Sequence, residues 1–279
     1  MANSFALAQN YLNDPANLNA VYKEASKTMD LEAPRVEFAG ANVVKLPKIS
    51  FGAGLGDYSR ANGYTALDSV LAWDTYTLSQ DKGNKLPIDV MDLEESKQSE
   101  GIIKFINEYV RQVVVPAVDT YRFSKLVAGT GTTKALTLTA DNIVDELLTA
   151  DATLTENEVP ADGRIIYMAA AKLQLLQSSS DISKYISYGT YTGNIDNRVV
   201  SFNGARIIIV PQARLGANTQ FLMVHPSAVM SVIKHNPSYI VPRGQHTDGD
   251  FDVALYRMYH DCFVVANKTK GVYLQTVTA

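Results

Sequence analysis

Residues 92–128 have the sequence DLEESKQSEGIIKFINEYVRQVVVPAVDTYRFSKLVA, the longest helical pattern in the chain. Apolar side chains recur in it at steps of three or four residues, which places them on one face of a helix. The pattern predicts one very long helix of about 50 Å, at a rise of 1.5 Å per residue. The apolar positions are Ile102, Ile106, Tyr109, Val113, Ala117 and Tyr121.

Both ends of this helix carry boundary signals. Asp92 and Glu95 are spaced as in a capping box, and Gly129 follows the last helical residue. Pro116 predicts a bend near the middle, because proline removes one helical hydrogen bond. The opposite face is charged and is expected to meet solvent. Its residues are Lys104, Glu108, Arg111 and Arg122.

Length and composition limit the class of protein. The 279 residues, 46% of them hydrophobic, suffice for one elaborate domain or two subdomains. The formal net charge of -4 gives no general attraction to nucleic acid. Cys262 is the only cysteine, which excludes an internal disulfide and a multi-cysteine zinc site. The N-terminal sequence lacks the pattern of a secretory signal, and no apolar run is long enough to predict a transmembrane helix.

The region before the long helix predicts an arm and a ribbon. Residues 1–42 are poor in large apolar side chains, which is typical of an arm ordered against a neighbouring subunit. Strands are expected over 43–51, 69–80 and 85–90, the last after a turn at 81–84. Together they suggest a long antiparallel ribbon. Since an isolated ribbon is barely stable in water, another subunit is expected to support it.

The region after the long helix predicts mixed α/β structure. Helices are expected over 139–155, 169–177 and 226–235, with Pro226 at the favourable first position of the last. Asn203-Gly204 is a strong signal for a hairpin turn. Strands are expected over 164–168, 199–202, 205–210, 221–224 and 251–277.

Two glycine-rich runs could be taken for phosphate-binding loops. Residues 52–56, GAGLG, are not followed by an apolar helix, so a loop is favoured. Residues 129–134, GTGTTK, lack the Gly-Lys-Ser/Thr ending and predict a helix terminator and a turn. Neither run indicates a nucleotide site.

One acidic cluster resembles the start of a calcium loop. Val253 and Tyr259 occupy the places of the glycine and glutamate that such a loop needs, so a solvated acidic loop is favoured. The remaining histidines are dispersed and accompany no nucleophile motif. The sequence therefore predicts no catalytic residue, cofactor or metal site. The residues weighed are His246, Asp248, Asp250 and Asp252, and then His225, His235 and His260.

The order of parts (arm, ribbon, long helix, mixed α/β region, C-terminal strands) resembles the major capsid proteins of tailed bacteriophages. The matching stretches are SRANGYTALDSVLAWDTYTLSQDKGNKLPIDVMDLEES, VVVPAVDTYRFSKLVAG, SFNGARIIIVPQARL and FDVALYRMYHDCFVVANKTKGVY. The second is the most specific, and the resemblance covers nearly the whole chain from about residue 42. Its key residues are Pro116, Asp119, Tyr121, Arg122 and Lys125.

The resemblance implies an α+β fold shared by tailed-phage capsid proteins and encapsulins. It implies an N-terminal arm at 1–42 and an extended β-loop at 43–87. It also implies a peripheral domain at 88–134 and 250–279, containing the long spine helix, and an axial α/β domain at 135–249.

The function implied is structural. The chain would self-assemble into pentamers and hexamers that form an icosahedral head around double-stranded phage DNA, without sequence-specific DNA binding. Its partners would be further copies of itself, with scaffold, portal and decoration proteins as further candidates. It would be a virion component assembled in the cytoplasm of a host bacterium.

The expected subunit contacts lie in the extended loop. They are Trp73, Tyr76, Lys82 and Lys85. Some relatives crosslink a loop lysine to an asparagine, for which Lys82 or Lys85 with Asn267 are the candidates. Two alternatives stay open: an encapsulin-type shell that holds cargo enzymes, and a cytosolic α/β enzyme with a site in residues 225–252.

Overall fold

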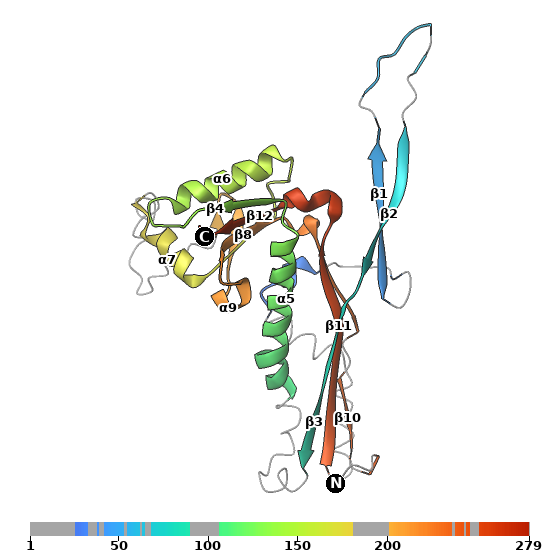
Figure 1. Ribbon diagram of the computed structural model, residues 1–279, viewed down its shortest axis with the longest axis vertical. Coiled ribbons are helices and arrows are strands. Elements are labelled where there is room, and N and C mark those ends of the chain that lie inside the picture. The colour runs from blue at the N-terminus through green and yellow to red at the C-terminus, as the bar shows by residue number, and fades with distance from the viewer. Residues whose placement is uncertain are drawn as a thin grey trace, which may run out of the picture. The chain divides into compact units, whose positions relative to one another are not determined.

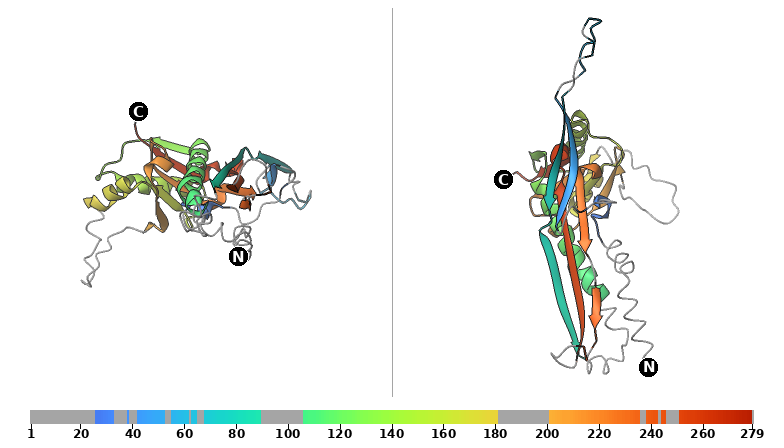
Figure 2. Two further views of the ribbon diagram at one scale, coloured as in Figure 1. Left: turned by 90° about the horizontal axis from the view of Figure 1, so that it is seen from below. Right: turned by 90° about the vertical axis from the view of Figure 1, so that its right-hand side faces the viewer.

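The computed structural model describes residues 26–32, 38, 42–52, 55–61, 63–64, 68–89, 106–180, 201–235, 238–242, 244–245 and 251–278. The chain divides into two compact units. The first, called the body, comprises Met1–Ala33 and Gln80–Ala279. The second, called the ribbon, is Pro34–Ser79. Figures 1 and 2 show the body as two sheets joined by helix α5.

The ribbon consists of two strands, as the sequence predicted. Strand β1 (Val43–Phe51) pairs antiparallel with β2 (Ser69–Thr77) along its whole length. Besides one bridge between Phe38 and Val44, these strands pair only with each other in the described part of the chain. Pro47 is tolerated because a strand with a free edge can lack one donor.

The third expected strand is not part of the ribbon, and the turn predicted at 81–84 is wrong. Strand β3 (Gln80–Asp89) runs straight through these residues and pairs with β11 (Phe251–Val264). Gly83 serves close strand packing there, since a Cβ on it would lie 3.0 Å from the carbonyl oxygen of Tyr256. Polar turn-forming residues therefore occupy a straight strand.

The first sheet of the body is built around β11. It contains β3, β9 (Val229–His235) and β10 (Ser238–Val241), each antiparallel to β11. The helix predicted at 226–235 is wrong, because only Pro226–Ala228 forms a 3₁₀ turn. The apolar run that follows includes β-branched residues, which favour a strand when a partner such as β11 is present.

The second sheet has six strands in the order β4-β12-β8-β5-β7-β6. The predicted hairpin is confirmed, with positive φ angles of 48° at Asn203 and 83° at Gly204. The predicted strands at 164–168 and 221–224 are also confirmed. The strand bounds are β4 Thr132–Ala135, β5 Ile165–Met168, β6 Ser201–Phe202, β7 Ala205–Ile209, β8 Thr219–Val224 and β12 Val272–Thr276.

Apolar side chains fill both faces of this sheet. Alternate residues of β5 face opposite sides, so that Ile166 packs toward α6 (Ile143–Glu156) and α7 (Ala170–Ser178). Tyr167 packs on the other side, where its ring meets Phe123 of α5. Helix α6 begins after Asn142, three residues later than the expected cap. The two helical layers leave the central strands fully buried.

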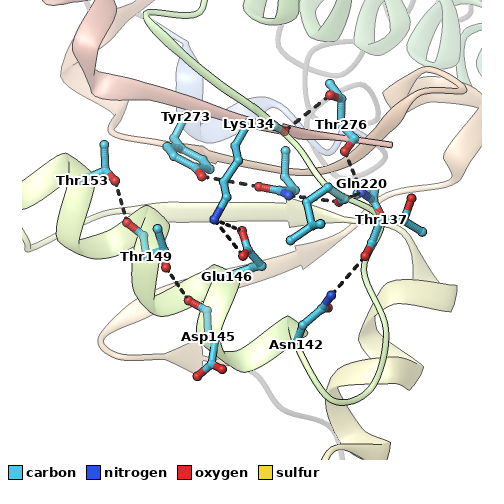
Figure 3. A network of polar contacts seen from close by, with 12 residues as sticks. Lys134, Thr137, Asn142, Asp145, Glu146, Thr149, Thr153, Gln220, Tyr273 and Thr276 are labelled. Carbon is cyan, nitrogen blue, oxygen red and sulfur yellow. Dashed lines mark hydrogen bonds and ion pairs between the residues drawn. The ribbon is translucent and has the colours of Figure 1, made fainter. Parts of the chain in front are cut away.

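Figure 3 shows how α6 and the edge strand β4 are joined. Lys134 of β4 forms an ion pair of 2.8 Å with Glu146 of α6. The side chain of Gln220 donates to the carbonyl of Thr276 at 2.8 Å and accepts from the amide of Leu138 at 2.8 Å. A buried amide side chain therefore satisfies backbone groups at the end of β12 and just after β4.

The long helix is described from Ile106 onward, so Asp92, Glu95 and Lys104 lie outside the described residues. A wide π turn at Val110–Val114 precedes α5 (Val115–Ala128). This irregularity lies just before Pro116, where a proline ring clashes with the preceding turn. Gly129 ends the helix with an ordinary φ of -95°. It is needed for space, because a Cβ would lie 2.6 Å from Val264.

The buried face of this helix differs from the predicted one. Ile106 is 1% exposed, as expected, but Val113 is 50% exposed. Arg122, assigned to the charged face, is fully buried. The wide turn shifts the phase of the helix, so a fixed 3.6-residue period misplaces the residues that follow. The buried positions are Ile106, Val110, Val114, Val115, Val118, Asp119, Arg122, Phe123 and Leu126.

Within the described residues, no helix combines the length and apolar character needed to cross a membrane.

A matched pair of substitutions tests this face. Ile106→Asp buries a charge against the β11 sheet and should lower the free energy of unfolding by about 3 kcal/mol or more. Val113→Asp, on the same helix but exposed, should change it by about 0.5 kcal/mol. Urea denaturation of both variants provides the measurement. Equal losses in the two would show that the helix faces are assigned wrongly.

Candidate functional site

The ribbon carries an exposed apolar face. Side chains alternate along a strand, and the pairing sets Ile49 opposite Leu71 and Pro47 opposite Trp73 on the same face, with Phe51 at its end. Ile49, Leu71, Trp73 and Phe51 are 58–66% exposed. We call these five residues the apolar face of the ribbon. A contiguous patch of this kind is typical of an interaction surface.

The other face of the ribbon has a different composition. Next to the apolar face it presents Lys48, Ser50 and Asp74 beside Leu46, Ala72 and Val70, with Val44 and Tyr76 further along the strands. Two successive residues of one strand, Ile49 and Ser50, therefore belong to an apolar and a more polar face. This contrast makes the apolar face distinguishable by mutation.

Aromatic side chains mark the region beyond the strands. The rings of Tyr58 and Tyr64 lie 5.0 Å apart, and both side chains are exposed. The backbone groups of Ser59 and Gly63 form a bridge between them. No helix follows the glycine run in the described residues 55–61, which agrees with the prediction of a loop there.

The structure places the four predicted contact residues in two units. Trp73 lies on the apolar face of the ribbon, whereas Tyr76 lies on the opposite face, across from Val44. Lys82 and Lys85 belong to β3 in the body, both exposed. Lys85 places its ammonium 5.7 Å from the centroid of the Phe251 ring. The four residues therefore belong to two units, and their role as subunit contacts stays a prediction.

The residues weighed as metal or catalytic groups do not converge in the described structure. Asp252 is buried within β11, and residues 246–250 lie outside the described residues. Among the residues that are described, no three His, Cys, Asp or Glu side chains are grouped so as to hold a metal ion. Burial raises the pKa of Cys262 to about 12, which keeps this thiol unreactive.

A second feature, missed from the sequence, is a buried cluster of charges around Asp119. The Asp119 carboxylate accepts hydrogen bonds from Ser26 Oγ at 2.8 Å, Thr28 Oγ1 at 2.7 Å and the Lys27 amide at 3.0 Å. Arg214 of α9 (Gln212–Leu215) donates a fourth at 3.1 Å. Asp119 is fully buried, so these donors replace the water that its charge would otherwise need.

Arg122, one turn further along α5, completes this cluster. It donates to Thr28 Oγ1 at 2.9 Å and forms an ion pair with Glu32 at 3.1 Å. The cluster therefore fastens residues 26–32 to α5. Asp119 and Arg122 belong to the stretch that is most specific for the resemblance, but their burial was not predicted, because opposite charges three residues apart also suit a solvated helix surface.

His260 of β11 lies close to this helix. Its ring meets the Tyr121 ring edge-on at 5.6 Å, and Tyr121 donates to Asp261 at 2.7 Å. Burial lowers the pKa of His260 to about 4, with a further contribution from the charge of Arg122. The imidazole is therefore neutral in the folded protein near neutral pH.

Comparison with known proteins supports a fold rather than a family. No protein-family model matches the sequence, and no curated protein matches it. The capsid structure of cyanophage P-SCSP1u matches with 13% identity over 89% of this chain and 86% of that chain, at a TM-score of 0.70. The mature capsid of bacteriophage PhiM1 matches with 14% identity over 86% of this chain and 83% of that chain, at a TM-score of 0.66.

This chain has the fold of phage capsid proteins. The predicted resemblance and the mixed helix and sheet class are thereby confirmed. A virus-like particle from Pyrococcus furiosus shares the capsid fold, with 11% identity over 93% of this chain and 96% of that chain, at a TM-score of 0.58. The matched structures are shells, not enzymes.

Acid should destabilise the subunit through His260. The pKa of His260 is about 4 in the folded state, below the usual 6.5. The contribution of its neutral imidazole to the free energy of unfolding is therefore complete above about pH 6.5. That contribution is lost as the pH falls toward 4, by up to about 3 kcal/mol. His260→Gln should remove this part of the pH dependence of unfolding, measured by urea denaturation between about pH 7 and pH 4.

The control for this measurement is His235→Gln, at an exposed position of β9. That variant should keep the acid sensitivity of the parent. An unchanged pH dependence in His260→Gln would show that His260 does not titrate as described.

Proposed function

We propose that this protein is a major capsid protein that self-assembles into pentamers and hexamers of an icosahedral head enclosing double-stranded phage DNA. The observation that carries the proposal is the exposed apolar face of the ribbon in a chain with a capsid fold. Such a face is unfavourable in a free subunit and favourable once a partner covers it.

A second copy of this chain is the partner that the ribbon fits. An isolated two-stranded ribbon is barely stable in water and needs support from another surface. In a symmetric shell every subunit can offer its ribbon and receive that of a neighbour, which is how repeated contacts close an assembly. The ribbon then gains burial that the single chain does not supply.

The parts of the chain take their capsid roles under this proposal. Residues 1–42 are the arm, and the extended loop begins at 43. Since β3 pairs with β11, we end this loop at residue 79 and place 80–87 with the peripheral domain. The remaining assignments are kept, with the peripheral domain at 88–134 and 250–279 and the axial domain at 135–249. A crosslink between Lys82 or Lys85 and Asn267 also stays a prediction.

No sequence-specific DNA contact is part of the proposal. The net charge of -4 supports a wall without general affinity for DNA, since nonspecific binding depends on cations that displace counterions. Scaffold, portal and decoration proteins are the further partners, in a virion assembled in the host cytoplasm.

A cellular shell that holds protein cargo is the second candidate. It is favoured by one observation, the match to the Pyrococcus furiosus virus-like particle over nearly the full length of both chains. The enzyme alternative is set aside, because the structures that share the fold are shells.

Electron microscopy of the purified full chain tests the assignment. Phage-like shells or capsomers are expected. Small uniform cages that contain protein cargo would favour the second candidate, and compact monomers at all concentrations would contradict both.

A pair of adjacent substitutions tests the role of the apolar face. Ile49→Asp places a charge within this face and should abolish shells, because burial of the unpaired carboxylate opposes assembly. Ser50→Asp adds the same charge to the other face of the same strand. It should leave shells largely intact. Both variants should unfold at the temperature of the parent subunit, since both positions are exposed.

Size-exclusion chromatography and electron microscopy provide the readout. Normal shells from Ile49→Asp would contradict the assignment of the interface. Loss of shells in both variants would show that the ribbon tolerates no charge, independent of its face.

A further inference from the structure

Strand β3 forms an open edge of the first sheet of the body. It pairs with β11 over its ten residues, and in the described part of the chain it pairs with no other strand. The right-hand view of Figure 2 shows it as the outermost strand of this sheet, beside β11. Residues 81–85 are all exposed. A long strand at the edge of a sheet is a template for pairing with a further strand.

Pro87 indicates which backbone groups of β3 point outward. Successive residues of a strand direct their backbone groups to opposite sides, and a proline fits where its missing N–H would point away from the ladder. Pro87 lies opposite Val253 of β11. Asp81 and Gly83 lie an even number of residues before it, so they direct their N–H and C=O groups to the open edge. Gly83 has no side chain, which lets a second backbone approach closely.

The charges of β3 suit a second copy of the same strand. Asp81 and Lys85 lie two residues before and two residues after Gly83. When two copies pair antiparallel about Gly83, Asp81 of each copy lies opposite Lys85 of the other. Opposite charges that face each other across an antiparallel pair stabilise it, whereas like charges destabilise it.

Other two-fold registers within residues 81–85 are less favourable. A two-fold axis at any charged residue would set that residue against its own copy, with like charges opposite. An axis at Asn84 would place Pro87 opposite Asp81, where a hydrogen bond of the ladder would be lost. With the axis at Gly83, Pro87 lies opposite Ser79, just outside β3. The charged residues are Asp81, Lys82 and Lys85.

We propose that β3 is a contact between two copies of this chain, in which residues 80–86 of the two strands pair antiparallel about Gly83. The contact joins the first sheets of two bodies into one continuous sheet. It is isologous, because each copy offers the same surface. It requires two copies and not a shell, so it goes beyond the proposed function and is tested separately from it.

Cysteine variants of the full-length chain test both the contact and its register. In the proposed pair Lys82 of one copy lies opposite Asn84 of the other, where the Cα atoms are about 4.5 Å apart, within the range of a disulfide. A mixture of Lys82→Cys and Asn84→Cys chains should therefore form linked dimers under mild oxidation. A non-reducing gel and mass spectrometry of the linked peptides provide the readout.

Each variant alone is the control for the register. Two copies of the same position lie two residues apart along the paired strands, beyond the roughly 7 Å that a disulfide spans, so neither variant alone should link. Asp141→Cys, exposed and outside β3, measures random collision when mixed with Lys82→Cys. Cys262 is buried and does not take part. Linkage in the first mixture that is absent, or no faster than in these controls, would overturn the proposal.

Charge variants test the pairing of Asp81 with Lys85, in chains that each carry one of the two cysteines. Asp81→Lys makes both positions positive, and Lys85→Asp makes both negative. Two chains with the same change should link several-fold more slowly than the parent pair, because like charges then face each other. One chain of each kind should link at nearly the parent rate. The same rate in all combinations would contradict the register.

Electron microscopy of the same samples separates this proposal from the shell function. Shells without linked dimers would overturn the β3 contact and leave the shell function standing. Linked dimers without shells would support the contact, while the shell function would fail.

Discussion

The buried pair of Asp119 and Arg122 is the constraint on which the rest of the body depends. Helix α5 packs its first half against the β11 sheet through Val115 and Val118, and its last turns against the six-stranded sheet through Phe123 and Leu126. The two charges lie between these apolar contacts. Removing them from water is costly unless each finds partners, and residues 26–32 supply most of the partners of Asp119. Residues 26–32 thereby satisfy the buried charge of a helix that packs on both sheets.

The ribbon presents the opposite situation. Its strands satisfy each other's backbone groups, but its apolar face includes four large side chains that remain exposed. The body buries most of its apolar side chains within one chain, whereas the ribbon leaves its apolar face exposed. Under the proposed function, a neighbouring subunit covers this face, and the division between body and ribbon is the one that a capsid subunit needs. Such a subunit must fold on its own and must still lower its free energy by burying apolar surface when it assembles.

Local sequence patterns predicted the structure correctly where neighbouring residues determine it. They gave wrong predictions where pairing with a distant strand determines it. Asn203-Gly204 forms its turn because both residues adopt positive φ readily. Residues 81–84 have the composition of a turn, yet the pairing of β3 with β11 keeps them extended. Residues 229–235 became a strand for the same reason. The apolar face of the ribbon was not predicted. Of its five residues only Trp73 was selected from the sequence, and Tyr76, selected with it, lies on the opposite face. A strand that pairs with residues 81–84 from nearly 180 positions away cannot be recognised from the neighbouring sequence alone.

The Asp119 cluster shows why buried charges escape prediction and what they contribute. A periodic pattern assigns Arg122 to solvent, because an isolated arginine is rarely buried. Its burial depends on Thr28 and Glu32, more than 85 residues earlier in the chain. An apolar pair at these positions could pack against many apolar segments. Asp119 instead requires three donors in one arrangement, which Ser26, Lys27 and Thr28 provide. The cluster thereby selects which segment of the chain docks on α5.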